Sequence, residues 1–179
     1  MEEQQLIEKC LKNDIRAQKK LYDKYAPLMM SVCLRYVRDR DVAQDILQEG
    51  FVKLFAKIPT YSGTGSFKGW MRKIFVNTAL EYLRKNDVLK YSADISAAAA
   101  VESKTESAIE KISADELMKC IMDLPTGFRT VFNMFAIEGY SHAEIAEKLG
   151  IQEGTSRSQY ARARLLLQQK IFEINKMNY

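Results

Sequence analysis

The chain of 179 residues is long enough for one domain or two small ones. Hydrophobic residues make up 47% of it, which allows an ordinary core, and the net charge of +4 is only a weak basic bias. Three widely spaced cysteines and a single histidine make neither a disulfide framework nor a metal-ligand cluster, so we expect free, buried thiols and no metal or cofactor. With no secretory signal and no apolar run of about 18 residues, we expect a soluble, cytoplasmic protein.

Glycine and proline are scarce, at eight and three residues, and few stretches alternate with a period of two, so the chain is predicted to be mostly helical. Residues 3–13 have the pattern of a short amphipathic helix, and Asn13-Asp14 provide a cap for the next helix. That helix is predicted to run to about Val37, because apolar residues recur along it at steps of three and four. Pro27 lies inside this pattern and is expected to kink or break the helix.

Residues 39–50 are acidic in a chain that is basic overall, with four acidic residues against one arginine. Asp41, Asp45 and Glu49 fall four residues apart, on a face next to the apolar stripe of a predicted helix. Such a face is either simply solvated or a docking surface for a positively charged protein partner. The pattern of residues alone does not separate these two interpretations.

A Gly/Ser loop at residues 61–66 leads into a predicted helix over residues 67–85 that mixes aromatic with basic side chains. Basic groups neutralise phosphates and aromatic faces stack on unpaired bases, so the combination suits a surface for single-stranded nucleic acid. Trp70 has core spacing, however, and we expect it to pack rather than to stack on a base. Asn77 is then the best-placed amide for holding a base.

Periodicity is lost from about Asp87 to Glu106, where small and polar residues dominate and four consecutive alanines favour some helix. A stretch of this composition between two patterned regions is predicted to be a flexible linker. Order resumes with a capping box that starts at Ser113, followed by a helix up to Pro125 and a further helix that ends at Gly139.

Close to the C-terminus, two helices are predicted with a tight turn between them. Ser141 and Glu144 have the spacing of a capping box, and Gly150 stands where a left-handed residue ends a helix. The second helix begins near Glu153, carries several arginines and is predicted to continue to Lys170. A short helix, a glycine-containing turn and a basic second helix form the helix-turn-helix signature, the alternative being an αα-hairpin whose basic face is solvated.

The order of these parts and the residues themselves resemble an extracytoplasmic-function (ECF) sigma factor, the small two-domain class of bacterial transcription initiation factor. Residues 41–51 are similar to region 2.2 of that family, residues 67–84 to regions 2.3 and 2.4, and residues 124–164 to region 4. The resemblance covers nearly the whole chain except the predicted linker. Three separate blocks in the right order are far more specific than one helix-turn-helix.

The resemblance implies an all-α fold of two helical domains joined by a flexible linker, with the helix-turn-helix in the C-terminal domain. Its implied boundaries are a region 2 domain, a linker and a region 4 domain at residues 1–88, 89–107 and 108–179. Four positions depart from the common pattern of the family. Gln44 stands where an acidic residue is usual, and Phe75 replaces a small residue. Ser156 replaces an aliphatic residue, and Gln159 stands where arginine is frequent. The last two bear on the base preference.

The resemblance also implies which residues act. Docking on the clamp helices of the largest RNA polymerase subunits falls to the acidic face, at Asp41, Asp45, Gln48 and Glu49. Holding the non-template strand of the −10 promoter element falls to Lys73, Asn77, Arg84 and Lys85. Contacts to the −35 element in the major groove fall to Ser156, Arg157, Ser158, Ala161 and Arg162.

The implied function is that of an initiation factor that binds core RNA polymerase, reads the −35 element as duplex DNA and opens the −10 element. It is not an enzyme and takes no small-molecule substrate, and we expect an anti-sigma protein as a further partner. One alternative is a stand-alone helix-turn-helix repressor or activator, which would leave the helix at residues 67–85 and the acidic face without a role. The other is an enzyme acting on nucleic acid, for which His142 beside scattered carboxylates gives no catalytic constellation. We expect His142 to be an exposed first-turn residue near the DNA backbone.

Overall fold

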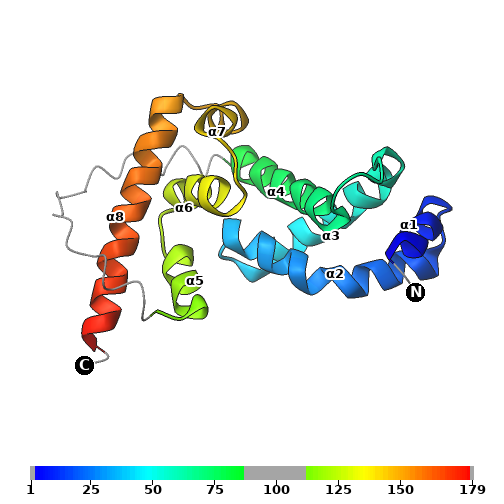
Figure 1. Ribbon diagram of the computed structural model, residues 1–179, viewed down its shortest axis with the longest axis horizontal. Helices are drawn as coiled ribbons and strands as arrows, with labels where there is room; N and C mark the ends of the chain where they lie inside the picture. The colour runs from blue at the N-terminus through cyan, green and yellow to red at the C-terminus, as the bar shows by residue number, and fades with distance from the viewer. Residues whose placement is uncertain (1–2, 87–111, 178–179) are drawn as a thin grey trace. The chain divides into compact units, whose positions relative to one another are not determined.

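The computed structural model describes residues 3–86 and 112–177, so the predicted linker lies outside the described residues. All regular structure within these two ranges is helical, which confirms the predicted all-α class (Figure 1). The chain divides into two compact units, residues 1–82 and 83–179. Within the described ranges, no helix combines the length and the apolar character that a membrane span requires.

The first unit consists of amphipathic helices and one short 3-10 turn. Its elements are α1 (Glu3–Leu11), α2 (Ile15–Tyr36), α3 (Arg40–Lys57), η1 (Ile58–Thr60) and most of α4 (Phe67–Lys85). Aspartates begin α2 and α3: Asp14 accepts hydrogen bonds from two amides of the first turn of α2, and Asp39 does the same for α3. Each carboxylate satisfies helix amides that have no intrahelical partner. The cap predicted at Asn13-Asp14 is therefore confirmed.

Helix α2 is not broken at Pro27 and continues from Ile15 to Tyr36. Proline removes one backbone donor inside a helix, which is why a break or kink was the expectation. The apolar stripe is nevertheless buried on both sides of Pro27, since Leu21 and Met29 are both 0% exposed. Burial along the whole stripe stabilises one continuous helix, because tertiary packing supplies most helical stability in proteins.

Helix α2 packs against both α1 and α3, and the aromatic centre of this core is Phe51. Its ring centroid lies 4.6 Å from that of Tyr22, 6.0 Å from that of Phe55 and 5.1 Å from that of Phe75. Gly50 makes room for the bulky Phe75, because a Cβ at position 50 would lie 2.4 Å from the Phe75 ring. The large residue at position 75 is thus matched by the absence of a side chain at position 50.

The second unit is built around one long helix, and the elements of its residues 112–177 are α5 (Ala114–Met122), α6 (Thr126–Phe132), the π-helical turn η3 (Asn133–Ile137), α7 (His142–Leu149) and α8 (Glu153–Met177). Helix α8 packs against α5, α6 and α7. Both predicted capping boxes, at Ser113 and Ser141, are present. Gly150 ends α7 in the left-handed conformation, with φ 67°, as its position predicts.

Helix α8 extends beyond Lys170, where the sequence pattern placed its end, to Met177. Ile171 is 5% exposed, so the buried face of the helix continues past that point. The Lys170 ammonium also lies 3.1 Å from the carboxylate of Asp123, at the end of α5. These two contacts give the last turns of α8 partners within the same unit.

A buried arginine joins α5 to α6. Arg129 is 2% exposed, and its Nη1 donates hydrogen bonds to the carbonyls of Met122 at 3.1 Å and Leu124 at 2.9 Å. These carbonyls lie at the C-terminal end of α5, where helix acceptors have no intrahelical donor. The guanidinium therefore fulfils the role of a C-terminal cap from a neighbouring helix.

The three cysteines are free and buried, as the sequence predicts. Burial raises the pKa of the Cys33 thiol to about 12, and it also raises the pKa of Cys10 and Cys120. A protonated thiol is a poor nucleophile and a poor metal ligand. In the described part of the chain, no group of three or more potential ligand side chains is placed to hold a metal ion.

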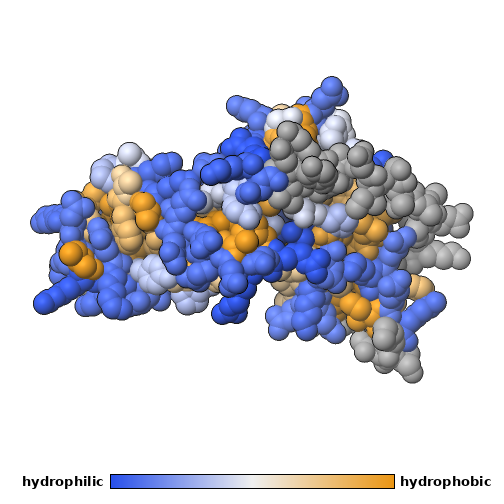
Figure 2. All heavy atoms as spheres, turned by 180° about the vertical axis from the view of Figure 1, so that it is seen from behind, coloured by the Kyte–Doolittle hydropathy of each residue, from blue (hydrophilic) through white to orange (hydrophobic). Residues whose placement is uncertain are grey.

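The surface in Figure 2 is mostly hydrophilic, and apolar atoms reach it in separate patches. The exposed large hydrophobic side chains of the described residues are Leu11, Ile15, Val52 and Phe172. Single exposed apolar residues are normal on protein surfaces, so only their setting gives them meaning.

Candidate polymerase and nucleic-acid interfaces

The acidic candidates for docking all lie on the exposed side of α3. Asp41, Asp45, Gln48 and Glu49 are exposed, whereas the intervening Ile46 and Leu47 are buried at 1% and 3% exposure. Residues three and four positions apart lie on one face of a helix, so the structure brings the four candidates together. Asp41 and Asp45 make no ion pair with any other described residue.

Glu49 differs from the other candidates because its carboxylate is already engaged. Lys53, one turn further along α3, places its ammonium 2.7 Å from Glu49 and 2.6 Å from Glu81 of α4. Burial lowers the pKa of Lys53, but the hydrogen bonds and charges of the two carboxylates outweigh it and raise the pKa overall. Lys53 therefore stays protonated at neutral pH and links α3 to α4.

Two of the basic candidates on α4, Lys73 and Arg84, form a stripe along one side of that helix. Lys73, Arg84 and Lys85 are exposed, and Asn77 is half-buried and already makes an interaction within the protein. Lys73 and Arg84 are eleven residues apart, which brings them to nearly the same side of the helix, about 16 Å from one another along its axis. Lys85 lies on a neighbouring side. The stripe is long enough to follow several nucleotides of a single strand.

Trp70 packs within the protein, as its spacing predicts. Its ring is stacked with Phe67 at a centroid distance of 5.6 Å and lies 5.1 Å from the ring of Tyr61. Tyr61 comes from the Gly/Ser loop, and its hydroxyl donates to the carbonyl of Gly65 at 2.9 Å. The three rings therefore fix the loop against the start of α4.

The candidates for duplex DNA lie in the first turns of α8, the second helix of the helix-turn-helix. Arg157, Ser158 and Ala161 are exposed and Arg162 is half-buried, and their spacing puts them on one side of the helix. Arg157 forms an ion pair with Glu153, one turn earlier, and both side chains remain largely exposed. An exposed pair of this spacing contributes only about 0.3–0.5 kcal/mol, so DNA phosphates or bases can displace it at little cost.

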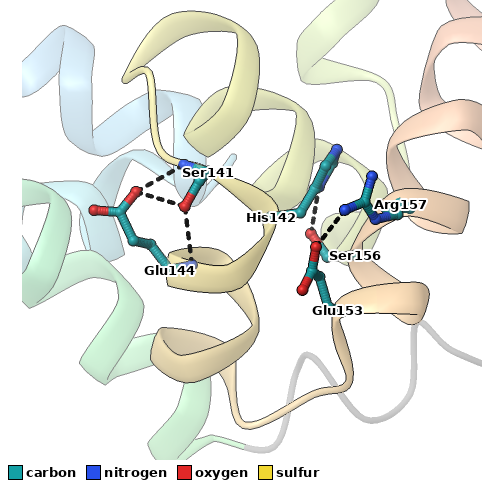
Figure 3. A network of polar contacts seen from close by, with 6 residues as sticks. All are labelled: Ser141, His142, Glu144, Glu153, Ser156 and Arg157. Atoms are coloured by element: carbon teal, nitrogen blue, oxygen red, sulfur yellow. Dashed lines mark hydrogen bonds and ion pairs between the residues drawn. The ribbon is translucent and has the colours of Figure 1, made fainter.

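Ser156 is the member of this set that the structure does not bring to the surface. It is 0% exposed, and its hydroxyl lies 2.9 Å from Nδ1 of His142, the first residue of α7 (Figure 3). In this arrangement its hydroxyl holds the start of α8 against α7 and does not face outward with Arg157. The serine at position 156, where the family usually has an aliphatic residue, thus has a hydrogen-bond partner within the protein.

His142 is half-buried between three elements, in contrast to the exposed position expected from the sequence. Its ring lies nearly parallel to that of Phe135, at a centroid distance of 4.3 Å and an interplanar angle of 12°, and 5.8 Å from the ring of Tyr160. Burial first, and then the charge of Arg157, lower the pKa of His142, while Glu153 acts in the opposite direction. The imidazole is neutral at pH 7 and serves as a packing and hydrogen-bonding group.

Phe135 reaches His142 from a π-helical turn that the sequence pattern did not reveal. Helix α6 ends at Phe132, and Asn133–Ile137 continue it with the wider π spacing up to the turn at Gly139. Such turns are rare and occur frequently at functional sites. Here the π-helical turn carries the ring that stacks on the first residue of α7.

Comparisons with known proteins agree with this layout. The family model Sigma-70 region 2 matches residues 21–88, and Sigma-70, region 4 matches residues 114–167. The chain is 30% identical to the ECF RNA polymerase sigma-E factor of Escherichia coli strain K12, over 94% of each chain. It is 29% identical to the RNA polymerase sigma-H factor of Pseudomonas aeruginosa, over 91% of this chain and 90% of the relative.

Among solved structures, the fold is similar to that of the sigma factor RpoE from Bartonella quintana, determined in complex with the anti-sigma factor NepR. The TM-score is 0.50 and the identity 21%, over 86% of this chain and 95% of that chain. Two family regions in the expected order and 30% identity along nearly the whole length set aside both a stand-alone repressor and a nucleic-acid enzyme. The chain belongs to the extracytoplasmic-function family of RNA polymerase sigma factors, regulatory proteins without enzymatic activity that direct transcription initiation at specific promoters.

Proposed function

We propose that this sigma factor divides its work between three helical surfaces on two domains. The region 2 domain, residues 1–88, docks on core RNA polymerase and holds the opened −10 element. The region 4 domain, residues 108–179, reads the −35 element as duplex, and residues 89–107 connect the two. The matched family regions, residues 21–88 and 114–167, fall inside these boundaries and support them.

Docking uses the outward face of α3, where Asp41 and Asp45 carry charges that no basic residue of the described chain neutralises. The partner is the pair of clamp helices of the largest polymerase subunits, which must present basic groups to this face. Charge complementarity of this kind steers association and fixes the orientation of the partners. Gln48 adds a neutral amide between the carboxylates, and Glu49 is shared with Lys53.

Opening of the −10 element uses the stripe on α4. Lys73 and Arg84 bind the backbone of the non-template strand, and Lys85 adds a further cation from the neighbouring side. Asn77 meets an unpaired base, for which it has to exchange its present interaction. Extruding a base costs a few kcal/mol, so a site that binds only the unstacked form shifts the equilibrium toward open DNA.

Recognition of the −35 element uses the first turns of α8 in the major groove. Arg157 and Arg162 are suited to guanine, whose O6 and N7 accept a bidentate contact from arginine. Ala161 supplies a small apolar surface for a thymine methyl group, and Ser158 a hydroxyl donor or acceptor. Ser156 acts indirectly, through its hydrogen bond with His142.

Regulation by an anti-sigma protein is part of the proposal, and the complex of the Bartonella quintana relative with NepR supports it. The protein acts in the cytoplasm, where core polymerase transcribes. It performs no bond chemistry itself and uses no cofactor or small-molecule substrate. The polymerase carries out the reaction.

The observation that carries the proposal is that one chain presents both the carboxylates of Asp41 and Asp45 on α3, unpaired within the described residues, and the exposed Arg157 in the first turns of α8. In vitro transcription with the purified chain and core polymerase on a promoter library tests it. We expect initiation behind a defined pair of upstream and downstream boxes, and its loss in a chain with Asp41→Lys and Asp45→Lys. Binding of symmetric duplex sites without polymerase, together with no specific initiation, would contradict the proposal.

A further inference from the structure

Val52 is an exposed apolar residue on the helix that carries the docking face. Its exposure is 69%, whereas the neighbouring large apolar residues of α3, Phe51 and Leu54, are buried at 3% and 0%. A β-branched residue at an exposed helical position is less favourable for the helix than alanine. The fold therefore gains little from a valine here, either through burial or through helix propensity.

The position of Val52 makes it continuous with the acidic candidates. It follows Gln48 by four residues and Asp45 by seven, and both spacings return to the same side of an α-helix. The face thus begins with Asp41 and Asp45 and ends, about one turn past Gln48, with an aliphatic side chain.

The charge on this face decreases toward Val52. Asp41 and Asp45 have no ion-pair partner in the described part of the chain, but the Glu49 carboxylate shares Lys53 with Glu81. The half of the face near Val52, where Glu49 and Glu81 share Lys53, therefore has a smaller net charge than the half near Asp41. Within that half the exposed aliphatic side chain of Val52 is available for burial against a partner, and removal of apolar surface from water is favourable.

We propose that the docking face of α3 is bipartite, with an acidic half at Asp41 and Asp45 and an apolar half centred on Val52. The occupant is core RNA polymerase, and the inference therefore rests on the docking surface proposed above. The complementary polymerase surface carries an aliphatic or aromatic side chain beside its basic groups. The acidic half sets the rate and salt dependence of docking, and the apolar half contributes a part of the affinity that salt does not screen.

Equilibrium binding of the fluorescently labelled full chain to purified core polymerase, measured over a range of salt concentrations, tests this division. Val52→Ala removes two carbon atoms from the contact and is expected to weaken binding about five- to fifteenfold at every salt concentration. Asp45→Lys is expected to weaken binding most at low salt and to flatten the salt dependence. Val52→Leu should bind nearly as well as the unchanged chain.

Ile15→Ala is the matched control, because Ile15 is 80% exposed at the start of α2, outside the docking face. It should bind as the unchanged chain does, and a melting curve of Val52→Ala should show an intact fold, since the residue is exposed. If Val52→Ala binds as tightly as the unchanged chain while Asp45→Lys does not, the apolar half is refuted and the acidic docking face stands. If neither variant changes binding, the docking surface itself is wrong.

Discussion

The hydrogen bond between Ser156 and His142 is expected to fix the start of α8, and its removal should weaken DNA binding without changing any DNA contact. Ser156→Ala removes a hydroxyl that is 0% exposed and lies 2.9 Å from Nδ1 of His142. A neutral hydrogen bond contributes about 0.5–1.5 kcal/mol, and water can reach the half-buried imidazole, so we expect a loss of stability of about 1 kcal/mol. His142→Phe keeps a ring against Phe135 but leaves the buried hydroxyl of Ser156 without its partner. For this variant we expect a loss of stability of about 1–3 kcal/mol.

A double-mutant cycle over Ser156→Ala and His142→Phe, followed by far-UV circular dichroism in urea, measures the coupling. We expect the two losses to be non-additive by about 1 kcal/mol, because each variant alone removes the same hydrogen bond. Binding of a −35 duplex by Ser156→Ala should fall with an unchanged salt slope, since no phosphate contact is lost. Strictly additive losses, or a loss of discrimination at a single base pair on Ser156→Ala, would refute the positioning role and make Ser156 a direct DNA contact.

Further consequences concern acid stability and the two cores. The pKa of His142 in the folded chain lies below its ordinary value of 6.5, so its contribution to stability is full above pH 6.5 and is lost as the pH falls through the lowered value. Urea titrations should therefore show a smaller free energy of unfolding at pH 5.5 than at pH 7.5, and His142→Phe should reduce this difference. Gly50→Ala should destabilise the first unit by about 1–3 kcal/mol by overpacking against Phe75, which exceeds the roughly 0.5–1 kcal/mol that alanine contributes to helix stability. Phe75→Leu in the same chain should recover most of this loss, and Trp70 fluorescence reports the unfolding. Arg129→Met should cost about 1.5–3 kcal/mol in the second unit, measured by circular dichroism, and an unchanged midpoint would show that its carbonyl contacts are not needed.

Local signals in the sequence were sufficient for most helix ends and for the helix-turn-helix. Ser141 with Glu144 and Ser113 with Glu116 form the predicted capping boxes, and Gly150 takes the predicted left-handed conformation. These features depend on residues within one turn of each other, so the spacing of residue types is enough to identify them. The exposure of Asp41 and Asp45 likewise follows from helical periodicity, although their binding role stays a prediction.

Contacts between elements could not be predicted in the same way. His142 and Ser156 are 14 residues apart, and Lys53 and Glu81 are 28 apart, so no local pattern joins either pair. For that reason Ser156 looked like a surface residue of the recognition helix, and His142 looked exposed. The continuity of α2 through Pro27 and the fit of Phe75 over Gly50 also depend on packing by other helices, which propensity does not contain.

The central claim, that one surface reads duplex and another holds opened DNA, is tested most directly by comparing Asn77→Ala with Arg157→Ala on two templates. Gel-shift binding of the chain with core polymerase, on a duplex promoter and on one pre-melted at the −10 element, measures recruitment, and permanganate footprinting of exposed thymines on the duplex measures opening. Arg157→Ala should lose recruitment on both templates, by about 1–3 kcal/mol if it contacts a base edge. Asn77→Ala should bind the duplex normally, open it poorly and recover on the pre-melted template. Loss of duplex recruitment by Asn77→Ala as severe as that of Arg157→Ala, with normal opening, would contradict the account.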